Sequence, residues 1–92
     1  MTGMRVARRF LVSGHVQGVG FRWFAHEAAG REGLNGIVRN RPDGSVEAVV
    51  EGEHEAIERF EIAIRRGPSR ARVTTVEVDS IPPSGHLGFT IE

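Results

Sequence analysis

The apolar residues of this chain change their period several times, and the order of those changes limits the fold more than any other feature. Residues 6–13 alternate imperfectly between apolar and polar, which favours a strand. Apolar residues then recur at helical spacing over residues 22–32. That pattern stops at Gly30 and Gly33, and glycine is typical of a helix C-terminus. The chain is therefore expected to begin with a strand and a helix.

A hairpin and a second helix are expected next. Pro42-Asp43-Gly44 is a strong turn signal between residues 37–39 and the alternating segment 46–50. Residues 53–66 carry an amphipathic stripe that begins with acidic residues and ends with basic ones. This distribution of charge complements the helix dipole, so residues 53–66 are predicted to be a helix.

Two further strands complete the pattern. Residues 75–79 alternate between valine and polar side chains, and residues 87–91 follow a break at Pro82-Pro83-Ser84-Gly85. The order βαββαβ with an added terminal strand predicts an α+β, ferredoxin-like split βαβ sandwich. We expect a four- to five-stranded antiparallel sheet with two helices on one face, in a single domain of residues 1–92. Which face of residues 6–13 is buried stays open.

A glycine-rich segment joins the first strand to the first helix: Gly14-His15-Val16-Gln17-Gly18-Val19-Gly20-Phe21-Arg22. Glycines at this place let successive main-chain N–H groups point into one concavity, where the helix N-terminus adds partial positive charge. The guanidinium of Arg22 would reach the same anion with two parallel hydrogen bonds. A tight strand-to-helix connection with a solvated arginine explains the same residues.

Two other phosphate motifs are excluded, because the segment lacks the Gly-Lys-Ser/Thr ending of a nucleoside triphosphatase loop and a third glycine at position 23. Asn40, before Pro42-Asp43-Gly44, is by pattern alone a turn residue that caps its own backbone. The residues by themselves leave both features open.

Residues 12–22, Val12-Ser13-Gly14-His15-Val16-Gln17-Gly18-Val19-Gly20-Phe21-Arg22, resemble the first signature of the acylphosphatase family. Residues 36–46, with Gly52 after them, resemble its second signature, in which the catalytic asparagine maps onto Asn40. One departure is Ile37, where the family usually has an aromatic residue, and it bears on the packing behind the asparagine. The resemblance covers essentially the whole chain.

The resemblance implies an acylphosphatase that hydrolyses the carboxyl-phosphate anhydride of acyl phosphates without a metal. Arg22 and Asn40 would be catalytic: Arg22 would bind the phosphoryl group and Asn40 would position the attacking water. The phosphate-binding residues would be His15, Val16, Gln17, Gly18, Val19, Gly20, Phe21 and Arg22. For the His15 side chain, a solvated loop position is an equal alternative.

The composition limits the classes of molecule that the chain is expected to bind. Twelve Lys plus Arg balance twelve Asp plus Glu, so the chain lacks the positive field that drives non-specific nucleic-acid binding. It has no cysteine, and its four histidines show no metal-ligand spacing, so neither a cofactor nor a metal is expected. The first ten residues contain arginines in place of a signal peptide's apolar stretch, and no segment is apolar enough to span a membrane. A cytoplasmic monomer that acts on a small molecule is expected.

Other readings of the same fold remain. An RNA-recognition domain would carry exposed aromatic residues on a central strand, and residues 46–50 have none. A domain that binds acyl or carbamoyl phosphate without hydrolysing it is the closer alternative; such domains belong to longer chains, and a chain that ends just after its last strand favours the hydrolase. An inactive interaction protein is a third. We expect Phe24 to lie in the core and Trp23 to cover the helix-to-loop junction without stacking on a ligand.

Overall fold

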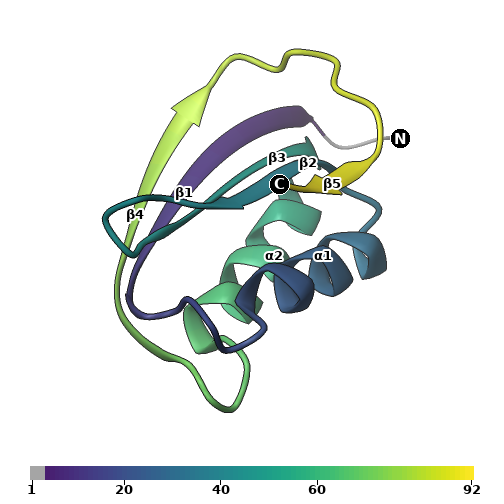
Figure 1. Cartoon of the computed structure of the whole chain (residues 1–92). Helices are drawn as coiled ribbons and strands as arrows, with labels where there is room; N and C mark the ends of the chain where they lie inside the picture. The colour runs from purple at the N-terminus through teal and green to yellow at the C-terminus, as the bar shows by residue number, and fades with distance from the viewer. Residues whose placement is uncertain (1–3) are drawn as a thin grey trace.

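Two helices lie on one face of a five-stranded sheet in the computed structural model of this chain, which describes residues 4–92 (Figure 1). The elements are β1 (Arg5–His15), α1 (Phe21–Arg31), β2 (Asn35–Asn40), β3 (Val46–Glu53), α2 (His54–Arg66), β4 (Arg72–Ile81) and β5 (Phe89–Ile91). Both helices begin and end within one residue of the bounds expected from the sequence. The order of strands and helices is also the expected one.

The strands are ordered β4-β1-β3-β2-β5 across the sheet. The four longer strands pair antiparallel, as expected, but β5 pairs parallel to β2, with Ile37 opposite Thr90. The parallel pairing follows from the path of residues 82–88, which cross the end of the sheet at which β4 ends and β2 begins (Figure 1). Because β5 starts at the same end of the sheet as β2, it runs in the same direction as β2.

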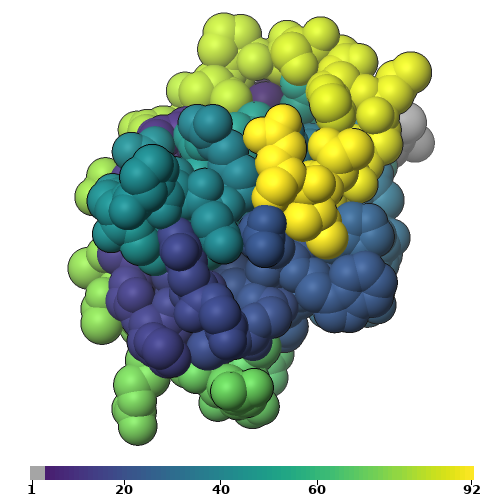
Figure 2. Space-filling model, in the orientation of Figure 1, coloured from purple at the N-terminus to yellow at the C-terminus, as the bar shows by residue number. Residues whose placement is uncertain are grey.

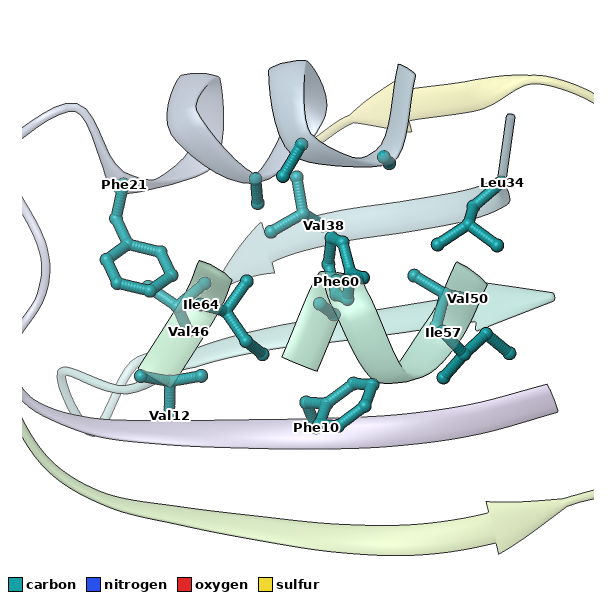
Figure 3. Packing of buried hydrophobic residues seen from close by; sticks show 14 of the residues in the cluster. Phe10, Val12, Phe21, Leu34, Val38, Val46, Val50, Ile57, Phe60 and Ile64 are labelled. Atoms are coloured by element: carbon teal, nitrogen blue, oxygen red, sulfur yellow. The ribbon is translucent and has the colours of Figure 1, made fainter. Parts of the chain in front are cut away.

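The core fills the space between the sheet and the two helices (Figure 3). Phe10 and Val12 of β1 face the helices and are fully buried, which settles the face that the sequence left open. Phe60 of α2 packs its ring 5.7 Å from that of Phe10. Each such side chain contributes about 1.5–3 kcal/mol by leaving water. Phe24, expected in the core, is only half-buried; Phe21, three residues earlier in α1, is the buried phenylalanine.

The other face of the sheet carries an ion-pair network centred on Glu47 of β3. The Arg9 and Arg39 guanidiniums, from the strands on either side, both donate hydrogen bonds to this carboxylate, and the Arg39 contact measures 2.6 Å. Burial raises the pKa of Glu47, but the hydrogen bonds from the two arginines outweigh burial, so the pKa lies below its ordinary value. The network joins β1, β3 and β2 at the point where β2 approaches its end.

Glu51 holds the segment of residues 82–88 against the same face. Its carboxylate accepts hydrogen bonds from the main-chain N–H and hydroxyl of Ser84 and from the N–H of Gly85. These bonds, with that from the Ser84 N–H first, hold the pKa of Glu51 below its ordinary value. At the far end of the segment, the Gly88 N–H donates to the Asn35 side chain, which sets the start of β5.

Among residues 4–92, no helix has the length and apolar character needed to cross a membrane.

Candidate functional site

A cavity of about 270 Å³ opens where the loop between β1 and α1 meets the end of β2 and the end of β5. Figure 2 shows the three parts side by side: the purple-blue loop and helix start, the teal hairpin, and the yellow C-terminal residues. The lining residues are Val16, Gly18, Gly20, Phe21, Arg22, Trp23, Asn40 and Ile91. Segments far apart in the sequence thus meet around one depression.

The loop of residues 16–20 presents its main chain to this cavity. Gly18 and Gly20 have φ angles of 76° and 79°, in the left-handed region that other residues rarely adopt. Within the described part of the chain, the N–H groups of residues 17–20 donate to no main-chain carbonyl. α1 begins directly afterwards at Phe21, and the first N–H groups of a helix have no partner inside the helix. Loop residues with unpaired N–H groups and the positive end of the helix dipole therefore border the cavity, an arrangement that suits an anion.

Arg22 places the one cationic side chain among the lining residues in the first turn of α1. Its guanidinium donates a hydrogen bond to the main-chain oxygen of Glu92, which follows β5. Glu92 is itself fixed to β2, because its N–H donates to the carbonyl of Val38 at 2.9 Å. The contact occupies only one of the five N–H groups of a guanidinium, so the others remain for a ligand.

Asn40 is the last residue of β2 and lies two residues beyond the buried Val38. Alternation along a strand directs both side chains to the face of the sheet that carries the helices. This brings the exposed Asn40 amide to the same cavity as Arg22. An amide group can accept a hydrogen bond from a water molecule and donate another to an anion.

The hairpin that carries Asn40 is fastened to the loop by the side chain of Gln17. Its amide nitrogen donates to the main-chain oxygens of Arg41, at 2.7 Å, and Ser45, at 3.0 Å. Inside the turn, the Asp43 carboxylate accepts hydrogen bonds from the hydroxyl and the N–H of Ser45. These two bonds, the hydroxyl's first, lower the pKa of Asp43. The position of Asn40 relative to the loop is therefore fixed by hydrogen bonds on both sides of the turn.

The structure brings together most of the residues that the sequence predicted for the site. Arg22, Asn40, Val16, Gly18, Gly20 and Phe21 line the cavity, whereas His15, Gln17 and Val19 do not. His15 is exposed at the end of β1, opposite Arg72 of β4, and Val19 is buried in the core. Gln17 acts on the hairpin through its side chain, a role that the sequence did not indicate.

Two lining residues were not predicted. Trp23 is 61% exposed, stacks on His26 with ring centroids 5.4 Å apart, and lines the cavity beside Gly18 and Gly20. Its place directly after Arg22 in the helix was the available signal. Ile91 reaches the cavity only through the parallel pairing of β5 with β2, for which the sequence held no signal.

Ile37, which stands where an aromatic residue was expected, does not lie behind Asn40. It is half-buried on the sheet face away from the helices, between Val49 of β3 and Thr90 of β5 in the strand register. In the described residues, no three histidine or carboxylate side chains come together in a group that could hold a metal ion. The cavity therefore offers main-chain N–H groups, one guanidinium and one amide for chemistry.

Comparisons with known proteins agree with this geometry. The acylphosphatase family profile matches residues 8–91. An acylphosphatase of Koribacter versatilis is 45% identical over 93 residues, which is 100% of this chain and 84% of that relative. The crystal structure of acylphosphatase from Bacillus subtilis superposes with a TM-score of 0.92 at 39% identity, covering 97% of this chain and 99% of that one. Full-length HypF, in its phosphate- and nucleotide-bound form, gives 0.89 at 30% identity, but the match is 12% of that chain.

Proposed function

Because this chain belongs to the acylphosphatase family, we propose that it hydrolyses the carboxyl-phosphate anhydride of small acyl phosphates to a carboxylate and inorganic phosphate. The observation that carries the proposal is the convergence of Arg22, Asn40 and the main-chain N–H groups of the loop on one cavity. The closer alternative, a domain that binds the same anion without hydrolysing it, needs the loop and Arg22 but gives Asn40 no task.

The phosphoryl group binds in the loop. Its oxygens accept hydrogen bonds from the free N–H groups of the loop and the start of α1, and from the guanidinium of Arg22. Arg22 also offsets the charge that moves onto the bridging and equatorial oxygens in the transition state. Removal of one well-placed donor of this kind typically costs about 10²–10³ in rate. The binding residues are thus those of the segment 16–22, mainly through their main chain; His15, at the end of β1, lies outside the cavity lining.

Asn40 positions the water. Its amide oxygen accepts a hydrogen bond from the water and fixes the water oxygen in line with the scissile P–O bond. The new bond forms between the water oxygen and phosphorus, and the bond from phosphorus to the acyl oxygen breaks. The carboxylate leaves with the electron pair and needs no proton. The proton of the water passes to an oxygen of the phosphate, since an amide is too weak a base to take it.

Positioning and charge stabilisation are sufficient for such a reaction, because the leaving group is already good. We therefore propose that hydrolysis is independent of metals and that residues 1–92 act as a single catalytic domain. The balanced charge supports a protein that does not bind nucleic acid, and the absence of cysteine supports the cytoplasm. We propose that a domain of this small size acts there as a monomer. Sedimentation at several protein concentrations tests the monomer, which a rise in mass with concentration would contradict.

The deciding experiment measures hydrolysis of benzoyl phosphate in excess EDTA by the wild type, Asn40→Ala, Arg22→Ala and Arg31→Ala. Arg31 is the matched control, because it is an exposed arginine of α1 that does not line the cavity. We expect turnover by the wild type and Arg31→Ala, and a loss of at least about 100-fold in the other two. Asn40→Ala should still bind inorganic phosphate by calorimetry, whereas Arg22→Ala should bind it weakly. A folded wild type that binds phosphate and does not turn over would establish the binding domain instead.

A further inference from the structure

Two exposed apolar side chains stand beside the polar groups of the cavity. Trp23 is 61% exposed and Ile91 is 40% exposed, although both are large residues that proteins usually bury. Both line the same cavity as Arg22 and Asn40. The anion and the water account for the loop, the guanidinium and the amide, but neither of them needs an indole or an isoleucine.

The indole of Trp23 is held in place from below. Its ring is nearly parallel to that of His26, with 13° between the planes and 5.4 Å between the centroids. His26 in turn lies edge-on to Phe89 of β5 at 5.9 Å, and Phe89 packs 6.5 Å from the core residue Phe60. The Nδ1 atom of His26 is buried without a hydrogen-bond partner among residues 4–92, and helical spacing in α1 places its ring next to that of Trp23. One face of Trp23 packs in this stack, and the rest of the indole is exposed.

We infer that Trp23 and Ile91 form a platform for the acyl group, and that they give this chain a preference for acyl phosphates with an aromatic or bulky apolar acyl group. The inference rests on the proposed function, since it assigns the other half of the same substrate. When the phosphoryl group lies in the loop, the acyl group has to leave the cavity past its remaining walls. Those walls are Trp23, which follows Arg22 directly, and Ile91, which precedes the Glu92 partner of Arg22.

The side chains that line the cavity favour an uncharged acyl group. Arg22 is the only ionisable side chain among the lining residues, and the bound phosphoryl group occupies it. A carboxylate or an ammonium in the acyl group would therefore find no partner in the cavity. An aromatic ring can instead stack on the indole, and such a pair adds about 0.5–1.5 kcal/mol beyond the area that it buries.

The first test uses probes without a reactive bond. Trp23 is the only tryptophan of the chain, so its fluorescence reports events at the platform alone. Benzylphosphonate and methylphosphonate carry the same anionic group with and without a ring. We expect benzylphosphonate to bind about 3- to 10-fold more tightly and to change the tryptophan emission, and inorganic phosphate to reverse that change. Equal affinities and equal emission changes for the two probes would overturn the inference.

The second test compares kcat/KM for benzoyl phosphate and acetyl phosphate in the wild type, Trp23→Ala and Ile62→Ala. Ile62 is the matched control, being 66% exposed on α2 and absent from the cavity lining. We expect the ratio of benzoyl to acetyl to fall about 3- to 10-fold in Trp23→Ala and to stay unchanged in Ile62→Ala. An unchanged ratio in Trp23→Ala, with both substrates still hydrolysed, rejects the platform and keeps the proposed function. A wild type that hydrolyses neither substrate rejects the proposed function itself, and the phosphonate titration still decides whether the ring is bound.

Discussion

The side-chain nitrogen of Gln17 lies 2.7 Å from the main-chain oxygen of Arg41, which is the residue after Asn40. The same nitrogen donates to the oxygen of Ser45 at 3.0 Å, on the opposite side of the turn. One amide group therefore fixes the distance between the glycine-rich loop and the asparagine at the end of β2. In the proposed mechanism this distance determines how far the attacking water lies from the phosphorus atom.

Replacement of this amide should separate binding from turnover. In Gln17→Met the side chain keeps its length and loses both hydrogen bonds to the hairpin, while the oxygens of Arg41 and Ser45 keep only their main-chain donors within the turn. We expect a loss of about 1–2 kcal/mol in the free energy of unfolding in urea and a fall in kcat. Affinity for inorganic phosphate, measured by calorimetry, should change less than kcat. If kcat stays at the wild-type value, the hairpin does not depend on Gln17.

Arg22 contacts the main chain of Glu92 and not its side chain. Alanine and proline at position 92 should therefore have different effects on KM. Glu92→Ala keeps the backbone and is expected to leave KM unchanged. Glu92→Pro removes the N–H that donates to Val38 and displaces the oxygen that receives the Arg22 guanidinium. We expect KM for benzoyl phosphate to rise several-fold in the proline variant only. Equal effects of the two would assign the role to the Glu92 side chain.

Stability should fall in acid partly because of Glu51. Its pKa in the folded state lies below the ordinary value of 4.5, so the unfolded chain binds more protons where the two differ. The stabilisation by Glu51 is therefore complete above about pH 4.5 and is lost as the pH falls through the folded pKa. Glu51→Gln should show a weaker dependence of the free energy of unfolding on pH below 4.5. Glu27→Gln, at an exposed position of α1, should follow the wild type.

Replacement of Gly18 and of Gly30 by alanine should change the free energy of unfolding in opposite directions. Gly18 has a φ of 76°, and although nothing lies within 4 Å of an added Cβ, the left-handed backbone itself costs an alanine about 1–2 kcal/mol. Gly30, inside α1, has the same open space and no positive φ, so Gly30→Ala is expected to gain about 0.5–1 kcal/mol. Thermal unfolding of both variants measures the difference. A stabilised Gly18→Ala would show that the left-handed backbone at this position carries no cost for alanine.

The sequence predicted the elements of the fold well, because their signals are local. The turn at Pro42-Asp43-Gly44 and the helix that ends before Gly67 follow from residues that lie next to one another. The terminal strand was expected within an antiparallel sheet, and its parallel pairing depends on the path of residues 82–88 along the sheet edge. That path is set by Glu51, a contact across 33 residues that no local pattern contains.

The residues of the candidate site also fall into those with a local sequence signal and those placed by long-range contacts. Arg22, Gly18 and Gly20 belong to one contiguous motif and Asn40 to a second, and the four residues line one cavity. The side-chain role of Gln17 and the place of Glu92 depend on contacts across 24 and 70 residues. His15 was expected near the anion because it lies inside the motif, but β1 continues through it and leaves it outside the lining. Membership of a motif fixes the main chain better than it fixes each side chain.

The tie between Arg22 and Glu92 also has a consequence for how the protein is made. The loop, α1 and β2 leave the ribosome well before residues 89–92, and β1 finds its partner β4 only after that strand has been synthesised. An incomplete chain can display the glycine loop, but it lacks the oxygen that orients the guanidinium. A chain in which β5 has not yet paired with β2 would therefore bind an acyl phosphate more weakly, by the several-fold expected for Glu92→Pro.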